Sequence, residues 1–255
     1  MKMMVAIKQV PQRDVQVRID ATGKWIEESD LQWALNESDA YALEEALQLK
    51  EKHGGEVVVI SAGPERVGST IREALAKGAD RAIHVDCDPG NLDVLGVARL
   101  LAAAIKSESP DLTLTGLQSD DLGYGQTGVI LAELMGLAHA TLILHVDKTD
   151  QGLMLKRELE EGWFQTIELP LPAVLTIQSG GNKLRYATLM GIKKAKTKEV
   201  RRVTAQDLGA PSTPAVTLER IAAPQKQKST QMLGGSAKEA AAALAEKLKF
   251  EARVL

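Results

Sequence analysis

The sequence predicts an α/β protein, with a doubly wound, mostly parallel sheet, an antiparallel β extension, and a C-terminal arm plus helix. Three observations lead to this prediction. Between residues 4 and 137, apolar runs of strand length alternate with helical patterns, as in consecutive βαβ units. After residue 140, short alternating strands are separated by Asp, Gly and Pro, and from residue 209 the strand–helix alternation is lost. We therefore expect an α/β domain over residues 1–208 and an arm with a helix over 209–255.

The composition is that of a soluble protein with no indication of a nucleic-acid partner. The 255 residues suffice for one large α/β domain with an appendage, and the net charge of -3 is mild. No apolar run approaches the roughly 20 residues that span a bilayer, so we expect a cytoplasmic protein without membrane insertion. The single cysteine, Cys87, excludes a disulfide framework and any multi-cysteine metal site, and we expect it to be structural.

The first elements are a strand and an irregular excursion. Residues 4–8 form an apolar run, and Pro11 is expected to end ladder pairing after it. Residues 13–33 alternate polar and apolar side chains, which predicts an extended excursion or a hairpin.

A helix is then expected over residues 36–53, where Asn36 or Ser38 can cap its start and Gly54 follows its end. Strands and helices alternate after it. They are expected at residues 56–64 (strand), 65–78 (helix), 81–86 (strand), 91–110 (helix), 111–116 (strand) and 125–137 (helix).

The later part of the chain departs from this alternation. Residues 141–180 are expected to extend the sheet with antiparallel strands, and residues 182–203 form a basic segment with mixed signals. An arm follows from residue 209. The chain closes with an alanine-rich helix that Ser236 can cap.

The turn at residues 116–128, GLQSDDLGYGQTG, has the layout of a phosphate-binding loop between a strand and a helix. The N–H groups near residues 125–127 and the hydroxyl of Thr127 can bind a phosphate. The turn has no lysine, so it is not a P-loop, and its glycines lie too far past the strand for a dinucleotide fingerprint. Asp120 and Asp121 can accept bonds from ribose hydroxyls or cap the helix. These features suit one phosphate and a ribose, although a plain loop with capping aspartates stays open.

No group of residues predicts catalysis or metal binding. The four histidines show no metal-ligand spacing, and His84 and His145 lie in apolar runs typical of core or sheet histidines. The acidic pairs Glu44–Glu45 and Glu160–Glu161 are interpreted as solvated helix or turn faces.

Several stretches, in order, resemble the β subunit of electron-transfer flavoprotein along essentially the whole chain. They are VAIKQVP, LNESDAYALEEALQLKEKHG, VVVISAGPERVGSTIREALAKGADRAIHV, GLQSDDLGYGQTG, LKRELEEG and PAVLTIQSGGNKLRYATLMGIKKAKTKEV. The resemblance implies an electron-carrier subunit, not an enzyme. It implies a heterodimer in which the α subunit carries redox FAD and this subunit holds AMP in a structural role, with no metal.

The resemblance also implies the residues that contact AMP. They lie at three strand ends that would surround one crevice. The set is Ala6, Asn36, Glu37, Ser38, Asp39, Ala62, Gly116, Gln118, Ser119, Asp120, Asp121, Gly123, Gly125, Gln126 and Thr127.

Two further sites follow from the resemblance. Leu189 matches the leucine with which family members dock flavin-dependent dehydrogenases, and Lys193, Lys194, Lys196 and Lys198 flank it. Without the family, a solvated helix with Leu189 buried is the alternative. Arg157 and Glu158 match a pair that faces the flavin domain of the α subunit; the alternative is an exposed strand ion pair. The implied electron acceptor is a quinone oxidoreductase or another acceptor.

Some features depart from the family or leave alternatives. Many members have Asn-Pro where this chain has Asn36-Glu37, and Arg13 lies near the position of a tyrosine close to the flavin. Electron-bifurcating members bind a second FAD in place of AMP; the loop DDLGYGQTG favours AMP and resembles a methylotroph-type branch. A stand-alone adenine-nucleotide-binding signalling module is the alternative from another class.

Overall fold

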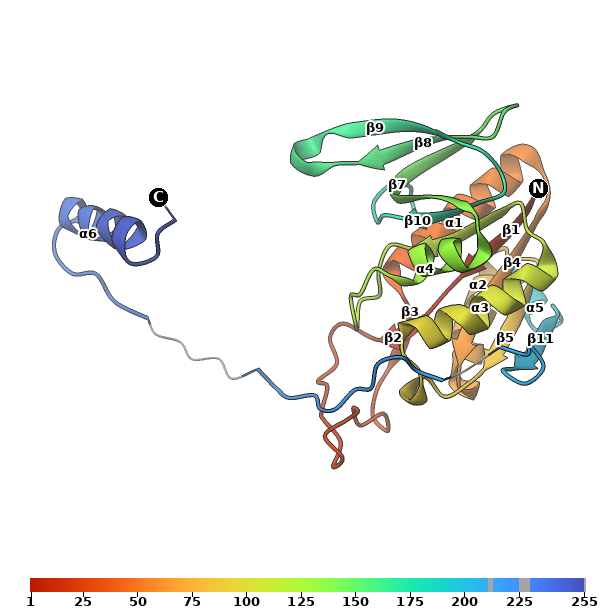
Figure 1. Ribbon diagram of the computed structural model, residues 1–255, viewed down its shortest axis with the longest axis horizontal. Coiled ribbons are helices and arrows are strands. Elements are labelled where there is room, and N and C mark those ends of the chain that lie inside the picture. The colour runs from red at the N-terminus through yellow and green to blue at the C-terminus, as the bar shows by residue number, and fades with distance from the viewer. Residues whose placement is uncertain (211–212, 225–229, 255) are drawn as a thin grey trace. The chain divides into compact units, whose positions relative to one another are not determined.

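The computed structural model describes residues 1–210, 213–224 and 230–254 (Figure 1). The chain divides into two compact units, Met1–Ile221 and Ala222–Leu255. Most of the predicted arm is described, but its residues 211–212 and 225–229, and residue 255 after the helix, lie outside the described residues. Among the described residues, no helix combines the length and apolarity that a membrane crossing requires.

A nine-stranded sheet forms the framework of the first unit, in the order β11-β5-β4-β1-β6-β10-β7-β8-β9. Its strands are β1 (Lys2–Ala6), β4 (Glu56–Gly63), β5 (Arg81–Asp86), β6 (Leu112–Gly116), β7 (Ala138–Lys148), β8 (Leu153–Glu158), β9 (Phe164–Leu169), β10 (Ala173–Ile177) and β11 (Val200–Thr204). The helices of this unit are α1 (Glu37–His53), α2 (Gly68–Lys77), α3 (Val94–Glu108), α4 (Thr127–Met135) and α5 (Leu189–Ala195). The predicted mostly parallel α/β sheet is confirmed.

The antiparallel extension is only partly as expected. Strands β7, β8 and β9 pair antiparallel to one another, as predicted. Strand β10 was expected in the same extension, and that expectation is wrong, because β10 pairs parallel with both β6 and β7. Its sequence, AVLTI, is buried at every position, which is typical of a strand covered on both faces. Strand β11, from the basic segment, also joins the sheet in parallel, beside β5.

Helices cover both faces of the parallel part of the sheet. Along β1, Met3 and Val5 face the core beneath α1 and α2, whereas Met4 and Ala6 face the core beneath α3 and α4. This alternation follows from the two-residue period of a strand. The apolar burial on both faces fixes which ends of the strands meet at one edge of the sheet.

The excursion after β1 is a hairpin-like segment. Strand β2 (Gln9–Pro11) pairs antiparallel with β3 (Trp33–Leu35), and Ile19 forms an isolated bridge with Ile26. Strand β2 ends at Pro11, where pairing was expected to stop. The Arg66 guanidinium lies 3.5 Å from the ring centroid of Trp33 and anchors the hairpin to the main body.

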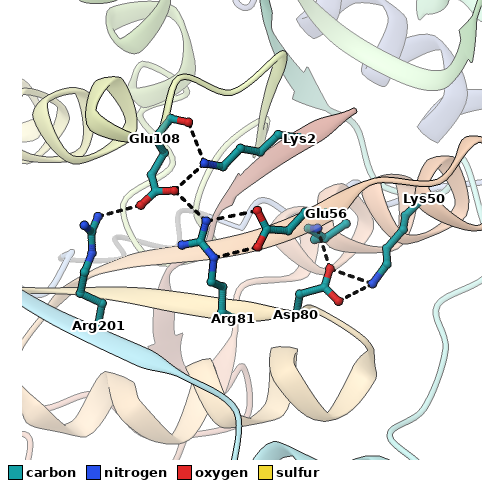
Figure 2. A network of polar contacts seen from close by, with 8 residues as sticks. Lys2, Lys50, Glu56, Asp80, Arg81, Glu108 and Arg201 are labelled. Atoms are coloured by element: carbon teal, nitrogen blue, oxygen red, sulfur yellow. Dashed lines mark hydrogen bonds and ion pairs between the residues drawn. The ribbon is translucent and has the colours of Figure 1, made fainter.

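The amino ends of the parallel strands are joined by ion pairs (Figure 2). The Glu108 carboxylate accepts bonds from Lys2 Nζ at 2.6 Å, Arg81 Nη2 at 2.7 Å and Arg201 Nη2 at 2.9 Å. Arg81 Nε also donates to Glu56 at 2.8 Å. The bond from Arg81 lowers the pKa of Glu108 to about 2. The network therefore connects the end of α3 to the first residues of β1, β4, β5 and β11.

The described residues of the second unit include the helix α6 (Ala237–Phe250). Ser236 caps it as predicted, in a capping box with Glu239, whose carboxylate accepts the Ser236 N–H at 2.7 Å. None of the residues of α6 is buried. Most helical stability in proteins comes from the packing of a buried face, which the described residues of α6 do not have.

Candidate nucleotide-binding site

The sheet has a topological switch point between β1 and β6. From β1 the chain passes through α1 to β4 on one side, and β6 lies on the other side of β1. In an open α/β sheet, ligands bind beyond the carboxyl ends of the strands at such a point. The turn at residues 116–128 begins at this place, directly after β6.

Asp39, in the first turn of α1, lies buried at the carboxyl ends of β1 and β6. Its carboxylate accepts the N–H groups of Lys8 and Gly116, each at 2.8 Å. Burial raises the pKa of Asp39 to about 7, although these two bonds oppose the shift. Because a carboxylate already holds the amides at the ends of β1 and β6, an anionic ligand has to lie farther out, toward the turn.

Asn36 connects α1 to the turn. It occupies the N-cap position, but its side chain makes no capping bond, contrary to one of the two predicted caps. Instead, Asn36 Oδ1 accepts the Asp120 N–H at 2.9 Å and Nδ2 donates to the Gln118 carbonyl at 2.9 Å. Ser38, the other predicted cap, donates its hydroxyl to that same carbonyl at 2.6 Å. Both side chains are used to shape the turn.

Glycine is required at two kinds of position in the turn. A Cβ on Gly116 would lie 2.3 Å from Ser38 Oγ and 2.4 Å from Asp39 Oδ1, so only glycine permits α1 to approach β6 this closely. Gly123 and Gly125 have φ values of 65° and 62°, the left-handed region that other residues rarely adopt. After them, α4 begins at Thr127, as predicted. Its first N–H groups have no acceptors within the helix.

The fold supplies the cations that the turn itself lacks. Lys8, at the end of β1, places Nζ 2.6 Å from Asp121 Oδ1 and 3.3 Å from Ser119 Oγ. Arg13 contacts Asp120 at 3.2 Å and also bonds to Glu37. Neither cation is in the predicted AMP-contact set, although Lys8 ends the first predicted strand, at one of the three strand ends expected to surround the ligand. A cleft of about 360 Å³ opens beside Arg13, between the β2–β3 hairpin and Glu37 and Asp120.

The two aspartates of the turn bind groups of neighbouring elements. Burial alone would raise the pKa of Asp121, but Lys8 lowers it overall, so Asp121 is a charged partner of that lysine. Asp120 Oδ2 accepts the Glu37 N–H at 3.3 Å. It therefore caps α1 and not the helix after the turn; the other predicted role of the aspartates, accepting bonds from ribose hydroxyls, stays a prediction.

The structure brings most of the predicted nucleotide residues together. Those joined by hydrogen bonds or ion pairs, directly or through Lys8 and Arg13, are Asn36, Glu37, Ser38, Asp39, Gly116, Gln118, Ser119, Asp120 and Asp121. Ala6 and Ala62 lie at or near the ends of the neighbouring strands β1 and β4, and Gly123, Gly125, Gln126 and Thr127 lead into α4. Small side chains at the strand ends, a cation and free helix N–H groups fit a nucleotide with one phosphate.

The predicted docking residues lie on a separate surface. Leu189 begins α5 and is 89% exposed, so the alternative in which it is buried is wrong. Lys193, Lys194 and Lys196 are exposed beside it. Lys198 is not part of this surface, because its Nζ donates to the Leu75 carbonyl at 2.9 Å.

Three exposed apolar neighbours of Leu189 were not singled out by the prediction: Tyr186 is 91% exposed, and Met190 and Ile192 are also exposed. The sequence does not indicate that these side chains are exposed, because most of its other apolar residues lie in the core.

Arg157 and Glu158 lie at the end of β8 and bond to separate partners. Arg157 Nε donates to the Thr141 carbonyl at 2.9 Å, and Glu158 accepts from Gln178 at 3.1 Å. The alternative of an ion pair between the two side chains is therefore not what the structure shows.

The remaining sequence-based interpretations have mixed outcomes. His84 is a buried sheet histidine whose Nε2 lies 2.8 Å from the Gly63 carbonyl oxygen, as predicted. Burial raises the pKa of the Cys87 thiol to about 11, which fits a structural role. The solvated-face interpretation of Glu44 and Glu45 is wrong, because these side chains are buried. Within the part of the chain that the structure describes, no three residues are grouped as a metal site.

Comparison with known proteins agrees with this architecture. The electron transfer flavoprotein domain family matches residues 24–208. The chain is 39% identical over 253 residues to the electron transfer flavoprotein subunit beta of Methylophilus methylotrophus, covering 94% of this chain and 96% of that protein. It is 34% identical to the subunit beta of Bacillus subtilis (strain 168), with both chains fully covered. It is also 35% identical to that of Homo sapiens, covering 89% of this chain and 90% of the human protein.

Each of these matches covers almost the whole length of the related protein, and each relative is named for electron transfer. Their subunit name implies a second, α subunit, and the family name implies a flavin. The chain therefore belongs to the electron transfer flavoprotein family, as a β subunit that carries electrons and is not an enzyme.

Proposed function

We propose that this β subunit binds AMP at the switch point as a structural brace, while the redox FAD resides in the α subunit. The observation that carries the proposal is the set of contacts at the carboxyl ends of β1 and β6. The Asp39 carboxylate already accepts the N–H groups there, and Lys8 lies against Ser119 and Asp121 of the turn. One phosphate can be bound by Lys8 and the free N–H groups of α4. A polyphosphate would meet the carboxylates of Asp120 and Asp121 as well.

AMP supplies no redox chemistry; when bound, it fills the crevice and neutralises its cation. The residues of this chain do the rest. Asp39 holds the ends of β1 and β6 together, Asn36 and Ser38 fix the turn, and Thr127 offers a hydroxyl at the first position of α4. The bound nucleotide would therefore stabilise the subunit that supports the flavin-bearing partner.

We further propose that flavin-dependent dehydrogenases dock on Tyr186, Leu189 and Met190. An exposed leucine that fills an apolar pocket contributes on the order of 1.5–3 kcal/mol. The lysines Lys193, Lys194 and Lys196 would steer a partner with an acidic rim and raise the association rate more than the affinity. The electrons would then pass through the α-subunit FAD to a quinone oxidoreductase or another acceptor.

Contacts with the α subunit complete the proposal. Arg157 and Glu158, at the end of β8, would face its flavin domain. The arm and α6 would pack on it, since α6 buries no residue of its own and exposes Leu244 and Phe250. A cytoplasmic location stays a prediction from the sequence.

The test is to co-express this chain with its α subunit, purify the complex, and identify the nucleotides that acid releases. We expect a yellow heterodimer with one AMP and one FAD. Two FAD molecules would indicate the electron-bifurcating type, and a colourless, stable monomer would indicate the signalling module. Release of no adenylate would overturn the proposal.

A matched pair of variants localises the nucleotide. Thr127→Val should lower the AMP content of the purified complex, because it removes a hydroxyl at the start of α4. Thr149→Val, in the exposed turn between β7 and β8, makes the same change away from the crevice and should leave AMP content at the wild-type level. Equal AMP contents in both variants would exclude a role for Thr127.

A further inference from the structure

The exposed apolar side chains of the docking segment, which we define as residues 182–198, raise a physical question. Tyr186, Leu189 and Met190 would be expected to turn toward the core, because burial of such side chains is favourable. In the structure they point outward and only Ala195 of α5 is buried. Something must hold the backbone of the segment in this orientation.

The first contact that holds the segment is an ion pair between Arg185 and Glu44. Glu44 lies in the second turn of α1. Arg185 Nε and Nη2 donate to the two carboxylate oxygens of Glu44 at 2.8 and 3.0 Å. The Arg185 backbone N–H reaches the same carboxylate at 3.3 Å. The two remaining contacts of the guanidinium are with Glu51, at 2.6 and 3.2 Å. Arg185 is thus held by two carboxylates of one helix, each in a two-point arrangement that fixes its direction.

Burial of Glu44 makes the loss of the Arg185–Glu44 contact costly. Glu44 is only 4% exposed. Burial alone would raise its pKa, but the bonds from Arg185 and Gln48 and the charge of Arg185 together outweigh burial, so the pKa lies below its ordinary value. Without Arg185, the buried Glu44 carboxylate would keep only the bond from Gln48 at 2.8 Å, and a buried charge that has lost its ion-pair partner is strongly unfavourable. The segment therefore cannot move away from α1 without a large cost.

The neighbouring Glu45, 2% exposed, fastens the beginning of the segment. Its carboxylate accepts the Asn182 side-chain amide at 2.9 Å and the Val146 N–H of β7 at 2.7 Å. His145 lies 3.4 Å away on the same strand. Asn182 is therefore connected through α1 to the sheet itself.

The end of the segment is fastened to α2. Arg72 Nη1 donates to the carbonyls of Ala195 and Lys198 at 2.6 and 3.0 Å. Lys198 donates in return to the Leu75 carbonyl. A Cβ on Gly191 would lie 2.2 Å from the Ala76 carbonyl oxygen, so α5 rests directly on the α2 backbone. Both ends of the segment are fixed by polar contacts, and its apolar side chains remain in solvent.

We propose that Glu44 and Arg185 are positioning residues for dehydrogenase docking: the ion pair of Arg185 with the buried Glu44 holds Tyr186, Leu189 and Met190 outward. This inference rests on the proposed docking function of Leu189. It gives α1 two roles, because the first turn of the helix forms the floor of the nucleotide crevice and its next turns hold the docking segment.

The experiment compares variants of the purified αβ complex. Arg185→Gln removes both two-point contacts, Glu44→Gln removes the buried charge, and Glu51→Gln removes only the exposed partner. Arg18→Gln, at an exposed site in the hairpin-like excursion, is the matched control. Arg185→Lys, which keeps the charge, provides a milder variant should Arg185→Gln not yield folded protein.

Two readouts separate positioning from general stability. Hydrogen–deuterium exchange of the amides at 182–198 should increase about tenfold or more in Arg185→Gln, less in Glu51→Gln, and not at all in Arg18→Gln. With a flavin-dependent dehydrogenase that reduces the wild-type complex, KM for the complex should rise about tenfold while kcat changes less than twofold. AMP and FAD contents should stay at wild-type levels. A lower melting temperature with unchanged exchange at 182–198 and unchanged KM would overturn the inference.

Leu189→Ala distinguishes failure of this inference from failure of the proposed function. If Leu189→Ala leaves KM unchanged, the docking function is refuted, and the positioning role falls with it even where exchange at 182–198 has increased. If Leu189→Ala raises KM and Arg185→Gln and Glu44→Gln do not, docking stands and the positioning role is refuted.

Discussion

The two edges of the same parallel sheet are built in different ways. At the amino edge, charged side chains pair with one another: Glu108 is 10% exposed as a side chain and binds Lys2, Arg81 and Arg201 (Figure 2). At the carboxyl edge, the buried carboxylate of Asp39 binds backbone N–H groups. The cations at the carboxyl edge, Lys8 and Arg13, have more exposed side chains.

This difference separates stability from binding. At the amino edge, Lys2, Arg81 and Arg201 all pair with Glu108 within the chain, and these ion pairs join α3 to the strands. At the carboxyl edge, Lys8 and the 62%-exposed Arg13 have carboxylate partners that a phosphate can replace. Changes at the amino edge should therefore alter stability alone, and changes at the carboxyl edge should alter nucleotide binding as well.

The largest effect is expected from Gly116→Ala at the carboxyl edge. The new Cβ would lie 2.3 Å from Ser38 Oγ and 2.4 Å from Asp39 Oδ1, so α1 and β6 must separate. We expect the free energy of unfolding to fall by about 3 kcal/mol, the upper range for overpacking, and AMP to be lost from the complex. Chemical denaturation and nucleotide analysis measure the two effects.

Gly68→Ala is the control for this change. Gly68 begins α2, and an added Cβ would meet no atom within 4 Å. Since alanine favours a helix over glycine by up to about 1 kcal/mol, this variant should be as stable as the wild type or more so. Wild-type stability and AMP content in Gly116→Ala would contradict the close packing at the switch point.

The second effect is at the amino edge. Glu108→Gln leaves Lys2, Arg81 and Arg201 without their shared anion, and we expect a loss of about 2 kcal/mol at pH 7, between the values for exposed and buried pairs. The AMP content should not change. Glu199→Gln, at an exposed position before β11, should have almost no effect.

The pH dependence of the Glu108→Gln variant has a definite sign. The pKa of Glu108 is about 2 in the folded protein and 4.5 ordinarily, so its stabilisation is complete above about pH 4.5 and is lost as the pH falls toward 2. The difference in unfolding free energy between wild type and Glu108→Gln should therefore shrink over that range. A constant difference would show that Glu108 acts through packing and not through charge.

The third effect concerns Asp39→Asn. One of the N–H groups of Lys8 and Gly116 would lose its acceptor, at a cost of about 1.5 kcal/mol, and AMP retention should fall. The pKa of Asp39 is raised from 3.8 to about 7 by burial, so between those values the folded protein holds a proton that the unfolded chain has released. Wild-type stability should therefore fall as pH rises from 4 to 7, more steeply than that of Asp39→Asn. Parallel curves would mean that Asp39 is ionised throughout.

The comparison of the two edges also shows what the sequence could predict. Apolar runs and helical periods identified the parallel strands and the turn at 116–128, because these signals are local. The place of β10 between β6 and β7 was not predicted, since strand order depends on pairing between distant segments. For the same reason the ion pair of Lys8 with Asp121, 113 residues apart, was missed.

Burial of charged residues was the other gap. Glu44 and Glu45 look like part of a solvated helix face, and only the fold reveals that Arg185 and Asn182 cover them. An exposed Tyr186 is equally hidden in the sequence, because its apolar character alone predicts burial. Both errors concern α1 and the docking segment. There the proposed docking function requires side chains to depart from the usual burial preference.

The smallest effect on stability is expected from Lys8→Gln, and it is the sharpest test of the difference between the edges. Lys8 and Asp121 form a partly exposed pair, so the unfolding free energy should change by less than about 1 kcal/mol. AMP should nevertheless dissociate about tenfold faster, because the cation nearest the turn is lost. This acceleration should weaken at high salt, where charges are screened.

Lys24→Gln, an exposed control in the excursion, should change neither quantity. If Lys8→Gln lowered stability as much as Glu108→Gln and left AMP dissociation unchanged, the carboxyl edge would be a staple like the amino edge, and the phosphate would have to be bound by other groups.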